Sequence, residues 1–104
     1  SVDIRKRVTK ARAIQTKRFE DSETVHYNAQ MNTKQIRKYC KLDTSSVQLL
    51  KTAMERLNLS ARAYDRILKV ARTIADLEDK ISIESSHISE AIQYRSLDRE
   101  GWLG

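Results

Sequence analysis

The stretch LSARAYDRILKVARTIADLE, residues 59–78, decides the fold. Placed at 100° per residue, its apolar side chains gather within about 120° of arc, which predicts an amphipathic helix with one face in a core. This face consists of Tyr64, Ile67, Leu68, Ala71, Ile74 and Ala75. Ser60 is a favourable N-cap, and Leu59 before it is placed to pack against Tyr64 one turn into the helix.

The composition of the whole chain extends this prediction to an all-α fold. The 104 residues include no proline, and the two glycines are Gly101 and Gly104 at the very end. A β-sandwich or an α/β domain of this size would need glycines in its turns, so these fold classes are excluded. The length suits one domain with a single modest core.

The other segments divide by their periodicity into further helices, a loop and a tail. We expect a helix over 1–19 and a loop over 20–31. A short helix should follow from its cap Asn32 to about Cys40, and a longer one should start near Asp43 or Thr44. The last helix is expected from Ser85 or Ser86 to about residue 96, followed by a tail over 97–104 in which Trp102 can dock. The inward faces are predicted to be Val47, Leu50, Met54 and Leu57 in one helix and Ile88, Ala91, Ile92 and Tyr94 in the last. The result is a single domain over 1–99, with a helical core over 32–96, built as a four- or five-helix bundle.

The positive charge is concentrated at the start of the chain. Residues 1–18 hold seven basic residues and the single acid Asp3, so this segment accounts for the whole net charge of +6. The other residues hold 13 basic and 13 acidic side chains. The basic helix is therefore either a solvated or interdomain helix or a surface that contacts a nucleic-acid backbone. The candidate contacts are Arg5, Arg7, Lys10 and Arg12.

Several kinds of chemistry have no motif in this chain. There is no GxxxxGK[ST] loop and no apolar strand ending in acids that hold Mg²⁺, so the chain is not expected to be an enzyme on its own. One cysteine, Cys40, and two distant histidines, His26 and His87, do not make a zinc site. Cys40 is expected to be an inert, half-buried thiol in a reducing cytoplasm, and His87 a cap-region or partly buried imidazole near a helix start. No apolar run is long enough to span a membrane, and no signal peptide is recognisable.

The cations of residues 59–78 have two interpretations. Arg62, Arg66 and Lys69 lie within about 60° of one another opposite the apolar face, and such a stripe is ordinarily a solvated surface. The alternative is that Arg62 contacts a phosphate. Its planar fork suits an anion, and it stands in the first turn of its helix, where the backbone N–H groups and the helix dipole also favour negative charge.

Four stretches resemble the C-terminal domain of magnesium-chelatase-like AAA+ ATPases, nearest the competence-related bacterial branch. They are SVDIRKRVTKARAIQTKRF, NAQM, LSARAYDRILKVARTIADLE and HISEAIQYRSLDR, in order over Ser1 to Arg99. The resemblance implies a helical lid domain of the AAA+ type behind a nucleotide-binding core. In that family the start of the helix matching SARAYDR carries the sensor-2 arginine, which contacts the γ-phosphate of ATP, and this role maps onto Arg62. Arg66 is a second candidate for nucleotide contact, although a solvated face remains its first interpretation, and Lys69 and Arg72 are expected to be surface or interface charges.

The resemblance also implies the partners. These are ATP with Mg²⁺ in the full-length protein, the AAA+ core of the same chain and neighbouring subunits in a hexameric ring, with Arg62 serving nucleotide in its own or the neighbouring subunit. No stable ATP binding is expected from this domain alone. The competence-related branch implies a motor on DNA in recombination, whereas the true chelatases imply metal insertion into a porphyrin. The basic first helix favours DNA.

Two other classes of protein stay open from the residues alone. One is a stand-alone basic helical module that binds nucleic acid without an ATPase. The other is a structural bundle for protein interaction, in which neither nucleotide nor DNA responds to Arg62→Ala.

Overall fold

The protein is all-helical, as the sequence predicts. The computed structural model describes the backbone of residues 2–99 and the side chains of residues 2–94. The elements are α1 (Val2–Arg18), the 3₁₀ turn η1 (Asn28–Gln30), α2 (Thr33–Tyr39), α3 (Thr44–Arg56), α4 (Ala61–Leu77) and α5 (Ser85–Arg99). The predicted helices are all present. The last helix runs to Arg99, further than expected, and Trp102 lies outside the described residues.

Polar caps fix where three of the helices begin. The Asn32 side chain accepts from the backbone N–H of Gln35, and the Gln35 side chain accepts in return from the N–H of Asn32, a complete capping box. Asp43 caps α3 by accepting from the backbone N–H of Ser46, and this bond lowers the pKa of the Asp43 carboxyl. Ser60 caps α4 by accepting from the backbone N–H of Ala63. Each cap satisfies a backbone donor that the helix itself leaves without a partner.

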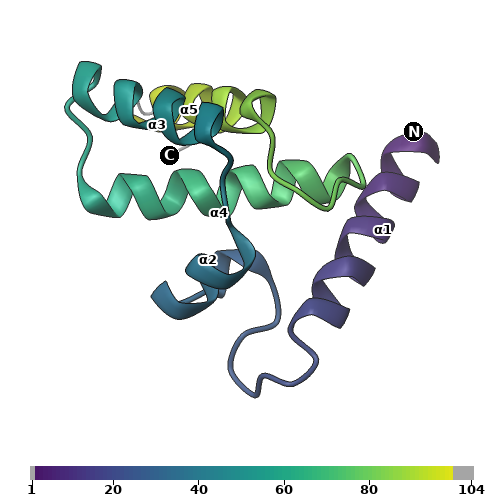
Figure 1. The fold of residues 1–104 in the computed structure, drawn as a ribbon. Helices are drawn as coiled ribbons and strands as arrows, with labels where there is room; N and C mark the ends of the chain where they lie inside the picture. Colours follow the sequence, from purple (N-terminus) through teal and green to yellow (C-terminus); the bar gives the residue numbers. More distant parts are fainter. Residues whose placement is uncertain (1, 100–104) are drawn as a thin grey trace.

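The helices are arranged around α4 (Figure 1). α3 and α5 lie together along one side of α4, and α2 and η1 lie on the other. α1 stands apart from α3 and α5. It packs against α4, near the end of α4 that leads into the loop towards α5. α4 is therefore central, with its first turn at one side of the molecule and α1 near its last turns.

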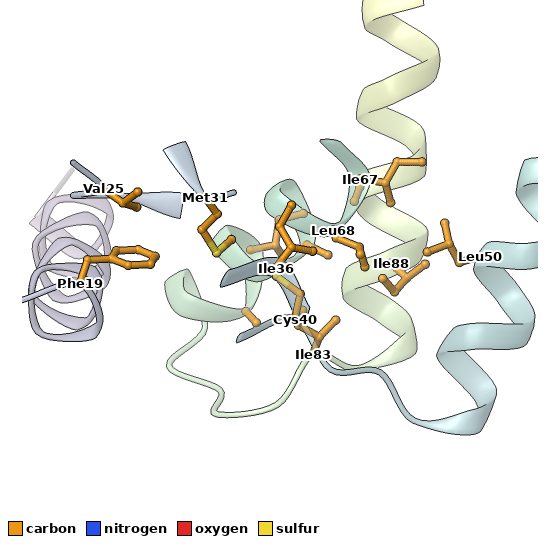
Figure 2. Packing of buried hydrophobic residues seen from close by; sticks show 14 residues of the cluster. Phe19, Val25, Met31, Ile36, Cys40, Leu50, Ile67, Leu68, Ile83 and Ile88 are labelled. Carbon is orange, nitrogen blue, oxygen red and sulfur yellow. The ribbon is translucent and has the colours of Figure 1, made fainter. Parts of the chain in front are cut away.

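One apolar cluster joins α2, α3, α4 and α5. Its buried members include Leu50, Ile67, Leu68 and Ile88 from the three long helices. Figure 2 shows these residues at one end of the cluster and Phe19, which directly follows α1, at the other. All predicted inward residues of α4 except Tyr64 belong to the cluster. The helical periodicity of the sequence therefore predicts most of this core correctly.

The predicted core is wrong at the first turns of α3 and α4. Val47 is 47% exposed and Tyr64 is 38% exposed. Each is the fourth residue of its helix and so stands in the first turn, near the helix end. Tyr94 of α5 is likewise on the surface rather than inside. The segment over 20–31 is not a simple loop, since η1 within it buries Asn28.

Two helices end on residues in the left-handed conformation. Asn58 follows α3 with φ of 50°, and Asp79 follows α4 with φ of 59°. Glycine is usual at such helix ends, because it has no Cβ to clash with the backbone, and asparagine and aspartate are the next best tolerated residues. The chain thus turns sharply after both helices with ordinary side chains.

Within residues 2–99, none of the helices is long and apolar enough to cross a membrane. Among the side chains of residues 2–94, no group of three His, Cys, Asp or Glu residues could hold a metal ion.

Candidate functional site

Arg62 projects from the first turn of α4 into solvent. Ser60 caps this helix, with its Oγ accepting from the backbone N–H of Ala63 at 3.2 Å. Arg62 itself is exposed, and within residues 2–94 no side chain or carbonyl forms a hydrogen bond or an ion pair with it. Its guanidinium is thus available at the positive end of a 17-residue helix.

Arg66 and Lys69 continue the stripe that begins at Arg62, but they have different surroundings. Arg66 is exposed and lies one turn further along α4. The Lys69 ammonium donates to the carbonyl of Ala29 in η1 at 3.1 Å. Both line a groove of about 450 Å³, whose other lining residues are Ala29, Ile67, Val70, Thr73, Ile74, Leu77, Ala91 and Tyr94. The groove carries two cations at its rim and no carboxylate among these residues.

Arg72 is not the surface charge that the sequence predicts. It is 4% exposed, and it donates to the carbonyls of Lys80 at 2.7 Å and Ile81 at 2.9 Å. It also lies 3.3 Å from Asp76, one turn along the helix. Burial lowers the pKa of the Arg72 guanidinium, and the Asp76 carboxylate opposes this effect. Arg72 therefore holds the loop that follows α4 in place through hydrogen bonds. Because its guanidinium is buried, it is not accessible to a ligand.

Arg18, counted from the sequence among the basic residues of the first helix, also turns inward. Its guanidinium binds the Asp76 carboxylate with two hydrogen bonds of 2.7 and 2.8 Å. It donates as well to the side chain of Asn28 at 2.8 Å. Asp76 is 1% exposed, so this is a buried ion pair that ties the end of α1 to the last turns of α4.

The remaining cations of α1 lie on the surface. Arg5, Arg7 and Arg12 are exposed, and within residues 2–94 no carboxylate pairs with any of them. Lys10 is different, because its ammonium lies 2.7 Å from the Asp79 carboxylate and both side chains are more than half exposed. The candidate nucleic-acid residues are thus all accessible, but Lys10 already has a counter-charge.

Sequence reasoning missed the network around Asp76. The spacing of Arg72 and Asp76, four residues apart on a helix, is a recognisable signal for an ion pair. No local pattern links Asp76 to Arg18 or to Asn28, which lie 58 and 48 residues away in the chain. These contacts come from the tertiary arrangement of α1 and η1 against α4.

His87 lies near a helix start, as the sequence predicts, but both His87 and Cys40 are more deeply buried than expected, with 1% and 5% exposed. His87 is buried near the start of α5, and its Nδ1 accepts from the backbone N–H of Glu84 at 2.8 Å. The ring proton is therefore on Nε2, which donates to the Glu78 carboxylate at 3.1 Å. Burial raises the pKa of the Cys40 thiol to about 11, so the nucleophilic thiolate is scarce at neutral pH.

Comparison with known proteins finds relatives over nearly the whole chain. Residues 1–95 match the family described as magnesium chelatase, subunit ChlI C-terminal. The protein named Competence protein ComM from Haemophilus influenzae is 42% identical over 99 residues, which cover 95% of this chain and 18% of that protein. Two proteins named Uncharacterized protein YifB, from Escherichia coli and Salmonella typhimurium, are each 39% identical over 99 residues, with 95% of this chain and 19% of the relative covered.

The chain spans about a fifth of the length of these curated relatives. The match extends over nearly all of the chain, and it includes the helix with Arg62 and the basic helix α1. The chain therefore belongs to the family of C-terminal domains of the magnesium chelatase subunit ChlI.

Proposed function

We propose that this chain is the helical lid of a chelatase-like AAA+ ATPase and that Arg62 is its sensor-2 arginine. The observation that carries the proposal is the exposure of Arg62 in the first turn of α4 without a partner among residues 2–94. Arg18 and Arg72, by contrast, are committed to Asp76. Arg62 is thus placed to meet the γ-phosphate of ATP that is bound by another domain.

The chemistry of this contact follows from the guanidinium and from the helix. An arginine fork donates two hydrogen bonds to phosphate and keeps its charge at any physiological pH. The α4 N-terminus adds the positive end of the helix dipole, which favours the same anion. Arg66, one turn further on, adds positive potential near the triphosphate. The Mg²⁺ ion and the remaining phosphate contacts belong to the nucleotide-binding core.

A lid of this kind turns hydrolysis into movement. An arginine that binds the γ-phosphate stabilises the closed lid with ATP and does not do so with ADP, so the nucleotide shifts the lid between two positions. The same contact stabilises negative charge during phosphoryl transfer. In a hexameric ring, the arginine can serve the nucleotide of its own or of the neighbouring subunit.

The test is Arg62→Ala in the full-length protein, with the nucleotide-binding core present. ATP turnover is expected to fall at least about tenfold, which corresponds to roughly 1.4 kcal/mol of transition-state stabilisation. Arg37→Ala is the matched control, since Arg37 is an exposed arginine on α2 and should leave turnover unchanged. Circular dichroism should show that both variants remain helical.

Two outcomes would contradict the proposal. Turnover that is equal in the Arg62→Ala and Arg37→Ala variants would remove the sensor role. A coding sequence upstream of Ser1 without a P-loop and an acidic Mg²⁺-binding strand would remove the ATPase core itself.

A second candidate function, contact with DNA, rests on the surface of α1. Arg5, Arg7 and Arg12 are exposed without acidic partners among residues 2–94. Clustered cations of this kind release counter-ions when they bind phosphates, which gives affinity without sequence preference. This surface fits a motor that moves on DNA, and it equally fits a basic module that acts without an ATPase.

Charge reversal at Arg5 and Arg12 is expected to weaken DNA binding by the full-length protein. It should also reduce the slope of log K against log salt by roughly two, because two phosphate contacts are lost. Lys10 is less suitable for this test, since Asp79 already offsets its charge. The control reverses Lys34 and Arg37 on α2, which changes the net charge equally. If both double variants lose affinity alike, the effect comes from net charge and α1 is not the contact surface.

A further inference from the structure

The attachment of α1 to the rest of the molecule is mainly polar. Among the described residues, the apolar cluster and the side chains packed on it include none from α1. The two buried residues of α1 are Ala11 and Gln15. Beyond Ala11, the half-buried Val8 and Ile14 provide only partial cover. The position of α1 must therefore depend on its hydrogen bonds and ion pairs to a larger extent than that of the other long helices.

These bonds converge on a set that we call the Asp76 joint, formed by Gln15, Arg18, Asn28, Arg72 and Asp76. Asn28 links its parts, because its backbone N–H donates to the Gln15 side chain at 3.0 Å and its side-chain amide donates to Asp76 at 2.9 Å. Arg18 completes the joint with its two hydrogen bonds to Asp76. Its guanidinium also lies 5.7 Å from the Tyr39 ring centre.

The joint fixes the direction of α1 as well as its position. Two parallel hydrogen bonds from one guanidinium to one carboxylate define an angle, whereas apolar side chains can slide over one another. The charges are also desolvated, so a partly opened joint would leave a buried ion without its partner. The joint is therefore stable when it is fully made, and intermediate positions of α1 are unfavourable.

We propose that the Asp76 joint makes α1 and α4 one mechanical unit, so that Arg18 and Asp76 are positioning residues for Arg62. Asp76 and Arg62 stand near opposite ends of α4, 14 residues apart, which is about 21 Å along a helix. A rotation of α1 is thus carried by α4 to the arginine at its first turn. This consequence for nucleotide rests on the proposed function, whereas the joint itself does not.

The first experiment follows amide hydrogen exchange in the full-length protein without nucleotide. Arg18→Met keeps an unbranched side chain near the Phe19 and Tyr39 rings but removes the fork. We expect exchange in residues 8–15 to become at least about tenfold faster, with a clearly smaller change in residues 67–75 of α4. Lys10→Met is the matched control, because it breaks an ion pair between α1 and Asp79 that is exposed, and it should change neither segment.

Two results of this experiment would overturn the joint. One is unchanged exchange in α1 of the Arg18→Met variant, which would mean that packing alone holds the helix. The other is an equal loss of protection in α1 and α4, which would mean that Arg18 serves the fold as a whole. Arg18→Lys restores the charge but not the fork, and a partial return of protection in α1 is expected from it.

The second experiment adds a non-hydrolysable ATP analogue to the same proteins. In the wild type, we expect exchange to change both at the first turn of α4 and in α1. In Arg18→Met, the response at α4 should remain and the response in α1 should be lost. A response in α1 that survives in this variant would contradict mechanical coupling through the joint. If Arg62→Ala leaves ATP turnover unchanged, the proposed nucleotide role of Arg62 is wrong. Hydrogen exchange without nucleotide still tests the Asp76 joint in that case.

Discussion

Asp76→Asn is expected to lower the free energy of unfolding of this chain by about 3–5 kcal/mol, the range found when one partner of a buried ion pair is removed. Asp76 is 1% exposed and accepts hydrogen bonds from Arg18 and Asn28, while Arg72 lies within 3.3 Å. Asparagine keeps the shape of the side chain but leaves two buried guanidinium groups without a negative charge. It also turns one acceptor into a donor that faces other donors.

The measurement is urea denaturation followed by far-ultraviolet circular dichroism. Asp79→Asn is the matched control, three residues further along the chain. Asp79 pairs with Lys10 at the surface, with 56% of its side chain exposed, and asparagine tolerates its left-handed backbone. The control should therefore change stability by less than about 1 kcal/mol. Equal losses in the two variants would show that the buried network adds nothing beyond a surface ion pair.

Ile88→Ala is expected to cost about 2–5 kcal/mol, because it leaves a cavity in the apolar cluster. Ile88 is fully buried, and it lies on α5, the helix that packs against both α3 and α4. Figure 2 shows its side chain near Leu68 and Leu50. Removal of its three outer carbons takes contacts from both neighbouring helices at once.

The control for this cavity is Ile81→Ala, the same chemical change in the loop between α4 and α5. Ile81 is 94% exposed, so its truncation should alter stability by no more than about 0.5 kcal/mol. Both variants can be compared by the midpoint of urea denaturation. A loss of less than about 1 kcal/mol for Ile88→Ala would mean that α5 closes over the gap or that the cluster is loosely packed.

The sequence predicts the helices well because their signals are local. Asn32, Asp43 and Ser60 are caps that act on backbone groups three residues away, and each begins a helix in the structure. The apolar arc of residues 59–78 predicts the central helix, since its buried face needs only helical periodicity. The family was also recognisable from these residues, and the match over residues 1–95 confirms it.

Charged residues are harder to place, because their environment depends on distant parts of the chain. Arg62 and Arg72 are both cations of one amphipathic helix, yet Arg62 is exposed and Arg72 is buried. At 100° per residue the two arginines are about 80° apart, and Arg72 stands at the flank of the apolar face, but this angle alone does not predict that Arg72 is buried. Arg72 is buried because the loop after α4 folds back and brings the carbonyls of Lys80 and Ile81 to its guanidinium. Arg18 is hard to place for the same reason, since its partner Asp76 is 58 residues away.

The candidate site shows the same limit. That Arg62 points away from the core could be predicted from its position opposite the apolar arc of α4. What it contacts could not, because a phosphate-binding role requires groups from another domain. The groove beside Arg66 and Lys69 was not foreseen either, since it forms between α4, η1 and α5.

The left-handed residues at the ends of α3 and α4 bear on the entropy of the unfolded chain. Asn58 and Asp79 hold conformations that glycine would adopt without strain. A glycine at either position would, however, give the denatured chain more freedom to lose on folding. Because Asn58 and Asp79 have side chains, the folded protein carries a small local strain at both positions. In return, the unfolded chain has fewer conformations to lose when it folds.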